Sequence, residues 1–245
     1  MHTIEANLSR IRETIGIHAR KAGRDPDRIT VVAVTKTVPP QRIREALAAG
    51  LRVFGENRVQ EAKAKIPQVD AEAQWHLVGH LQTNKARDAV ALFSLIHSVD
   101  SLRLAQAIDK QAARLGKTQR VLVQVNVSGE PSKFGVAPEE TAELLRAMAA
   151  LSHVRVEGLM TIPPLDPDPE ASRPYYRRLR ELAETLNALH LEGVSMQELS
   201  MGMSGDYPVA VEEGATLVRI GTALFGPRPP APPVRQAGEG SGRTG

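Results

Sequence analysis

Eight short apolar segments alternate with helical segments along the chain, and this order constrains the fold more than any other feature. The expected strands cover residues 29–37, 52–57, 75–80, 95–99, 120–127, 154–162, 198–203 and 217–225. An amphipathic helix over residues 3–22 precedes the first strand, and a helix follows each of the first seven. Regular β–α alternation favours a parallel sheet with right-handed crossovers, and eight such units match a closed (β/α)8 barrel.

The domain organisation follows from the same alternation. An open doubly wound sheet is the alternative to a barrel, but the turn after the first strand contains no G-x-G-x-x-G motif. We expect residues 1–226 to form one barrel domain and no second domain. The segment 227–245 is Pro-rich and then Gly-rich, which predicts a disordered tail.

Composition excludes several classes of function. The chain has no cysteine, which rules out disulfides and thiolate chemistry and makes a reducing cytoplasm the expected location. No apolar run is long enough to span a membrane, and the first residues lack the apolar core of a signal peptide. The net charge is only +3, and the basic residues are spread along the helices with few aromatics. A nucleic-acid-binding protein is therefore disfavoured.

Lys36 ends the first expected strand, ITVVAVTKT, just before Pro39 and Pro40. Side chains alternate along a strand, so Lys36 shares one face with Val32 and Val34. The ammonium could extend from the strand end into water. Alternatively, an amine among apolar side chains could have a lowered pKa and form a Schiff base with an aldehyde. The position of Lys36 alone leaves both interpretations open.

Other polar residues also gather at strand ends, where (β/α)8 barrels carry their sites. Asn57 ends the second strand and could line such a site or cap the next helix. His76 and His80 have the i, i+4 spacing of a zinc pair, but they lie on a strand, and core or rim histidines fit better. Small residues end strands seven (SMGMSGD) and eight (RIGTALFG), which is where these barrels commonly bind phosphate.

Arg219 lies inside the apolar strand LVRIG, where an unpaired guanidinium would be costly. It requires a partner, either a carboxylate such as Glu157 or Glu198, or a ligand. Together the chain offers an amine, a phosphate cradle and a buried arginine. Pyridoxal 5'-phosphate (PLP) has an aldehyde, a phosphate and a ring nitrogen to match them.

Several motifs resemble those of the pyridoxal phosphate homeostasis proteins, single-domain relatives of the N-terminal barrel of alanine racemase. They include VAVTKT, FGENRVQEA, WHLVGHLQTNK, HSVDS, VNVSGEPSKFG, GLMTIPP, LSMGMSGDY and VRIGTALFG, in the same order over residues 3–226. The resemblance implies a barrel of PLP fold type III, with PLP bound as a Schiff base on Lys36. It further implies that Ser200, Met203, Ser204, Gly221 and Thr222 hold the phosphate, that Arg219 faces the pyridine nitrogen, and that Asn57 lies in the pocket.

Function is expected to follow this family. The resemblance implies a non-catalytic, cytoplasmic protein that buffers or delivers PLP, with apo PLP-dependent enzymes as partners and a monomeric or weakly dimeric state. Indirect effects on amino-acid and keto-acid balance would follow. The alternative is a PLP-dependent amino-acid racemase. Such an enzyme needs a second acid/base opposite the lysine, and we expect none here, because the chain stops after strand eight and its three tyrosines lie in helical or loop segments.

Overall fold

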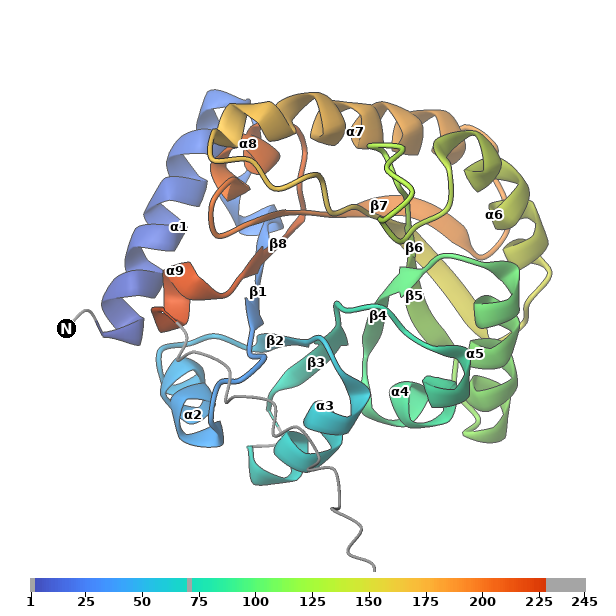
Figure 1. Cartoon of the computed structure of the whole chain (residues 1–245), viewed down its shortest axis with the longest axis horizontal. Helices are drawn as coiled ribbons and strands as arrows, with labels where there is room; N and C mark the ends of the chain where they lie inside the picture. The colour runs from blue at the N-terminus through green and yellow to red at the C-terminus, as the bar shows by residue number, and fades with distance from the viewer. Residues whose placement is uncertain (1–2, 70–71, 228–245) are drawn as a thin grey trace, which may run out of the picture.

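The computed structural model describes residues 3–69 and 72–227, and within them eight parallel strands close into a barrel in chain order (Figure 1). β8 returns to pair with β1, with Val32 opposite Arg219. This closure confirms the (β/α)8 barrel and excludes the open sheet. The strands are β1 (Thr30–Val34), β2 (Val53–Glu56), β3 (Gln74–Leu77), β4 (Leu95–Val99), β5 (Gln119–Gln124), β6 (Val154–Met160), β7 (Val194–Met203) and β8 (Leu217–Ile220).

Helices surround the ring of strands on its outside (Figure 1). They are α1 (Ile4–Lys21), α2 (Pro40–Ala48), α3 (Val59–Lys65), α4 (Ala86–Leu92), α5 (Leu102–Arg114), α6 (Thr141–Ala149), α7 (Arg173–Asn187), α8 (Tyr207–Glu212) and α9 (Thr222–Phe225). The expected N-terminal helix is present, and the Thr3 side chain caps it by accepting the N–H of Ala6. Helix α1 packs beside α9, where the Asn7 amide donates to the carbonyl of Leu224 at 2.8 Å.

The strand expected over 95–99 has the predicted bounds, but other boundaries are wrong. The strands expected over 75–80, 120–127 and 154–162 end earlier, at Leu77, Gln124 and Met160, and the strand expected over 198–203 begins earlier, at Val194.

Two further differences lie next to the site. The strand expected over 29–37 ends at Val34, because the backbone turns at Thr37, which has a φ of 63°. The strand expected over 217–225 ends at Ile220, and Thr222–Phe225 is the helix α9. The predicted tail, apart from its first residue, lies outside the described residues. Within the described ranges, no helix is both long and apolar enough to cross a membrane.

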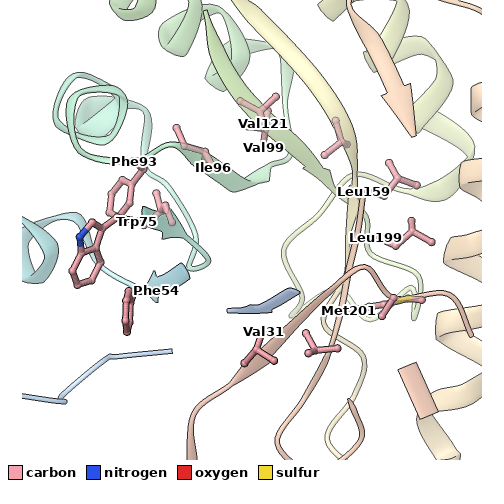
Figure 2. Close-up of a cluster of buried hydrophobic side chains, with 14 of the residues drawn as sticks. Val31, Phe54, Trp75, Phe93, Ile96, Val99, Val121, Leu159, Leu199 and Met201 are labelled. Atoms are coloured by element: carbon pink, nitrogen blue, oxygen red, sulfur yellow. The ribbon is translucent and has the colours of Figure 1, made fainter. Parts of the chain in front are cut away.

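Alternation along the strands divides the apolar side chains into two groups. One group packs between the barrel and the helices, where Val31, Phe54 and Trp75 lie with the other side chains of Figure 2. The second group includes Val32, Val34, Val78, Leu95, Leu122, Met160 and Leu217. Val32 and Val34 thus separate from Val31, as the period of two requires. Lys36 lies beyond the end of β1 and lines the same cavity as Val34.

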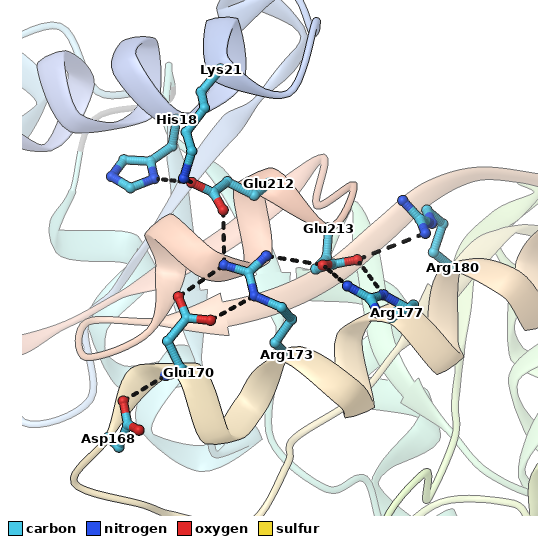
Figure 3. A network of polar contacts seen from close by, with 9 residues as sticks. All are labelled: His18, Lys21, Asp168, Glu170, Arg173, Arg177, Arg180, Glu212 and Glu213. Carbon is cyan, nitrogen blue, oxygen red and sulfur yellow. Dashed lines mark hydrogen bonds and ion pairs between the residues drawn. The ribbon is translucent and has the colours of Figure 1, made fainter.

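A network of ion pairs joins α8 to α1 and α7 (Figure 3). Glu212 contacts Lys21 and His18 of α1, both at 2.7 Å, and Arg173 of α7 at 2.8 Å. Glu213 contacts Arg173 at 2.9 Å and Arg177 at 3.1 Å. Lys21 lowers the pKa of Glu212 to about 2, against an opposing effect of burial and with help from Arg173 and His18. The network anchors α8, which directly follows the loop at the end of β7.

Candidate functional site

A cavity of about 600 Å³ opens at the carboxyl ends of the strands. Seven of the eight residues expected at the site line it, namely Lys36, Asn57, Met203, Ser204, Arg219, Gly221 and Thr222. Val34, Val78, Ile162, Pro164 and Leu165 supply apolar walls. The eighth residue, Ser200, is fully buried and is not among the lining residues. The structure therefore brings together residues from β1, β2, β7 and β8 that are far apart in the sequence.

Lys36 follows β1 and is half-buried at the cavity wall. Asn57 follows β2, and Arg58 occupies the N-cap position of α3, so Asn57 lines the cavity instead of capping that helix. The backbone of Asn57 lies against Gly79, where an added Cβ would come within 2.3 Å of the Asn57 carbonyl oxygen. A glycine at position 79 is therefore needed for this close approach.

Arg219 is buried on β8, and its hydrogen-bonding partners are neutral. One terminal nitrogen donates to Ser200 Oγ at 2.7 Å and the other to the carbonyl of Thr161 at 2.8 Å. Burial lowers the pKa of Arg219, although the charges of Tyr176 and Asp206 oppose the shift. An arginine nevertheless stays protonated in proteins. The site thus has a permanent, largely desolvated cation in its wall.

The two carboxylates considered as partners for Arg219 are engaged elsewhere. Glu157 forms an ion pair with Arg120 at 2.7 Å, and Glu198 accepts the hydroxyl of Thr216 at 2.5 Å. Among the described residues, Arg219 has no ion pair within 4.0 Å. Glu157 and Glu198 are therefore not the counter-ions of Arg219, and the carboxylate whose charge does act on it is Asp206.

Ser200 belongs to a chain of hydrogen bonds that we call the inner polar chain, comprising Arg219, Ser200, His97 and His76. Ser200 Oγ lies 2.8 Å from His97 Nδ1, and His97 Nε2 lies 3.0 Å from His76 Nδ1. Burial lowers the pKa of His76 to about 3 and that of His97 well below its ordinary value, so both rings are neutral near pH 7. Ser200 thus links the Arg219 guanidinium to His97, and its expected contact with phosphate stays a prediction.

His97 was missed by the sequence reasoning. His97 is two residues after Leu95 on β4, so the two side chains point to the same face of the strand. This spacing was a weak signal that His97 faces the barrel interior. His80, in contrast, stacks on Phe134 with ring centroids 3.9 Å apart and lies 3.6 Å from Asp100. His76 and His80 thus contact different partners. In the described part of the chain, no group of three or more histidine, aspartate or glutamate side chains could hold a metal ion.

The loops after β7 and β8 meet at Ser204. Its hydroxyl accepts the N–H groups of Gly221 and Ala223 at 3.1 and 3.2 Å. Gly202 has a φ of 89°, and an added Cβ would lie 2.5 Å from the Cβ of Ala210, so the β7 end requires glycine. A hydroxyl and backbone N–H groups converging at two strand ends can bind the oxygens of an anion such as phosphate.

Asp206 holds the β7 loop in place. Its carboxylate accepts the N–H of Met203 at 2.7 Å, the hydroxyl of Ser172 at 3.0 Å and the hydroxyl of Tyr176 at 2.6 Å. Burial, together with the charge of Asp206, raises the pKa of Tyr176. The loop that carries Ser204 is therefore attached to η5 (Pro169–Ser172) and α7.

Comparisons with known proteins agree with this geometry. The family model for the alanine racemase N-terminal domain matches residues 3–229. The pyridoxal phosphate homeostasis protein of Aquifex aeolicus is 48% identical over 222 residues, which are 90% of this chain and 96% of the relative. The PLP-bound structure of PipY from Synechococcus elongatus matches with a TM-score of 0.80 at 40% identity, covering 91% of this chain and 100% of PipY.

A more distant similarity shows the fold alone. An alanine racemase of Clostridium difficile matches with a TM-score of 0.68 at 15% identity, over 87% of this chain and 56% of the racemase. The close relatives, in contrast, match along nearly their full length. The chain belongs to the family of pyridoxal phosphate homeostasis proteins, built on the alanine racemase N-terminal domain.

Proposed function

We propose that this protein binds PLP, attached as a Schiff base to Lys36, and buffers or delivers the cofactor without consuming it. The observation that carries the proposal is the convergence of Lys36, Arg219 and the Ser204–Gly221 contact on one cavity. These groups match the aldehyde, the ring nitrogen and the phosphate of PLP. When bound, PLP supplies a reversible carbonyl for the amine and an aromatic ring that can accept electrons.

Arg219 argues for storage over turnover. Because an arginine only donates hydrogen bonds, a ring nitrogen next to Arg219 is an acceptor and stays unprotonated. An unprotonated ring withdraws electrons weakly, which disfavours chemistry that passes through a carbanion. The hydrogen bonds from Arg219 to Ser200 and to the carbonyl of Thr161 support this arrangement, since they leave the guanidinium little freedom to turn.

The tyrosines also favour storage. A racemase requires an acid/base group on the face of the cofactor opposite the lysine. Tyr176 donates its hydroxyl to Asp206, while Tyr207 is buried and Tyr175 packs against the core. None of these three is among the residues lining the cavity. The described residues therefore place no tyrosine for this role, and a PLP-dependent amino-acid racemase remains the alternative function.

The proposed role includes partners and a location. A cofactor that is stored reversibly must be passed to other proteins, so apo PLP-dependent enzymes are the expected recipients. Indirect effects on amino-acid and keto-acid balance would follow from the supply of PLP to such enzymes. We place the protein in the cytoplasm, because a chain without cysteine is compatible with a reducing compartment. We further propose that it acts as a monomer or weak dimer.

The test separates storage from catalysis. Protein loaded with PLP is incubated with L-alanine in deuterated water, and exchange at the α-carbon is followed by NMR. We expect little exchange, together with transfer of PLP to an added apo-aminotransferase. Racemisation over many turnovers would overturn the storage role in favour of the racemase.

A further inference from the structure

We propose that Glu61 is a positioning residue for Lys36. Its carboxylate holds the backbone of Thr37 in a strained conformation and thereby sets the direction of the Lys36 side chain. This inference rests on the proposed covalent binding of PLP at Lys36, and it assigns a part of that reaction to α3, outside the cavity. We call the contacts among Glu56, Glu61, Lys65, Thr35 and Thr37 the lysine clamp.

The clamp holds the residues on both sides of Lys36. Lys65 donates to the carbonyl of Thr35 at 2.7 Å, and the Thr35 hydroxyl donates to Glu56 at 2.6 Å. On the other side, the N–H of Thr37 donates to Glu61 at 2.7 Å. The backbone is thus fixed immediately before and immediately after Lys36.

Strain at Thr37 indicates that this fixation has a cost. Its φ of 63° lies in the left-handed region, which a β-branched residue rarely adopts. Among the described residues other than glycine, only Thr37 and His190 have a positive φ. Strained residues persist where the surroundings determine the backbone, and they gather at functional sites. The turn is closed by the N–H of Val38, which donates to the carbonyl of Thr35 at 2.9 Å, and Glu61 adds the side-chain contact that holds Thr37 within it.

Lys65 fixes the position of the Glu61 carboxylate. Glu61 and Lys65 are four residues apart on α3 and form an ion pair at 2.8 Å. Lys65 is buried and makes a second ion pair with the fully buried Glu56 at 2.6 Å. Its three N–H donors are therefore matched by Thr35, Glu56 and Glu61. Although burial opposes the shift, the hydrogen bonds from Lys65 and Thr37 hold the pKa of Glu61 below its ordinary value, so the carboxylate is charged near pH 7.

A merely structural role for the clamp makes a different prediction from a positioning role. If the clamp only stabilises the fold, its loss should weaken the binding of all ligands of the cavity equally, or of none. If the clamp aims Lys36, its loss impairs covalent capture while the cavity still binds a ligand that lacks the aldehyde. Pyridoxine 5'-phosphate is such a probe, because it keeps the ring and the phosphate but carries a hydroxymethyl group in place of the aldehyde.

The experiment compares three variants with the wild-type chain. Glu61→Ala removes the acceptor of the Thr37 N–H, Glu61→Gln keeps an acceptor without the charge, and Thr37→Gly removes the strain. Asp88→Ala is the matched control, because Asp88 of α4 forms an ion pair with Lys63 of α3 at 3.4 Å and this pair does not include Thr35 or Thr37. For each protein we would measure the rate of covalent PLP capture, the dissociation constants of PLP and pyridoxine 5'-phosphate, and the melting temperature.

We expect Glu61→Ala to slow capture and weaken PLP binding by about tenfold or more, since small misplacements of a reacting group have effects of this size. Binding of pyridoxine 5'-phosphate should change by less than about twofold, a difference that surface substitutions commonly produce. Glu61→Gln should recover part of the loss. Thr37→Gly keeps the N–H that donates to Glu61 and adopts a positive φ without strain, so its capture rate should stay within about twofold of wild type and its melting temperature should shift by less than about 4 °C.

Equal losses for PLP and pyridoxine 5'-phosphate would overturn the positioning role, and so would capture at Lys36 that no clamp variant slows. Glu61→Gln keeps the test decisive if Glu61→Ala fails to fold, because it retains an acceptor and should still slow capture more than it weakens pyridoxine 5'-phosphate binding. If the wild-type chain forms no adduct on Lys36 that borohydride can reduce, the proposed function itself fails, and the clamp proposal fails with it.

Discussion

Arg219→Met tests whether the buried arginine serves the ligand or the fold. Methionine is unbranched and apolar, so it fills much of the same space without a charge. The variant loses the hydrogen bonds to Ser200 and Thr161, which together contribute about 3–6 kcal/mol as bonds from a charged donor. It also removes the desolvation cost of a buried guanidinium, which is several kcal/mol.

These two effects nearly cancel, because Arg219 forms no ion pair with a carboxylate in the described part of the chain, although the charge of Asp206 acts on it. We therefore expect the unfolding free energy of the ligand-free protein to change by less than about 2 kcal/mol. The affinity of Arg219→Met for PLP, in contrast, should fall clearly. The loss of one hydrogen bond from a charged donor to the ring nitrogen, about 1.5–3 kcal/mol, corresponds to roughly 10- to 150-fold in dissociation constant.

The assay combines urea denaturation of the ligand-free protein with a spectroscopic PLP titration. Arg120→Met is the control, since Arg120 lies at the start of β5, pairs with Glu157 and does not line the cavity. It should leave PLP affinity unchanged. A drop of more than about 4 kcal/mol in unfolding free energy of Arg219→Met, the size expected for a broken buried ion pair, combined with unchanged PLP affinity, would refute this reasoning.

Two further predictions concern the rest of the chain. Deletion of residues 230–245 should leave the melting temperature and the PLP absorbance unchanged, and a large drop in either would mean that this segment packs on the barrel. Glu212→Gln should destabilise the protein near neutral pH, because the folded-state pKa of Glu212 is lowered from 4.5 to about 2 by Lys21, Arg173 and His18. A group with a lowered pKa stabilises fully above its unfolded value, so the difference between Glu212→Gln and wild type should shrink as pH falls from about 4.5 towards 2. A difference that stays constant over that range in urea denaturation curves would contradict this assignment.

Much of the architecture was predictable because it follows from local patterns. Alternation in the first strand placed Lys36 on the side of Val32 and Val34, and barrel topology then placed it near Arg219. The end of the last strand was not predictable in this way. The run LVRIGTALF is mostly apolar on both sides of the strand end, and α9 begins where Ser204, 17 residues away in the sequence, accepts the N–H of Gly221.

The roles of residues next to the cavity, such as His97 and Glu61, could not be predicted from the sequence for a related reason. His97 lies in the motif HSVDS, but nothing in that motif indicates its contact with Ser200, which spans 103 residues. The i, i+4 relation of Glu61 and Lys65 could be seen on a helix, but the contact of Glu61 with Thr37 spans 24 residues and depends on how α3 packs on the barrel. Contacts of this kind depend on tertiary packing, which periodicity does not encode.

Reductive trapping tests the central claim most directly. The protein is mixed with PLP, reduced with borohydride and digested with trypsin, and the labelled peptide is identified by mass spectrometry. Trypsin does not cleave after a modified lysine, so a label on Lys36 should appear on the peptide covering residues 29–42. Lys36→Ala should abolish that label. A pyridoxyl group on Lys63, Lys85 or Lys133 in the wild-type protein, or no label at all, would contradict the assignment of Lys36 as the covalent site.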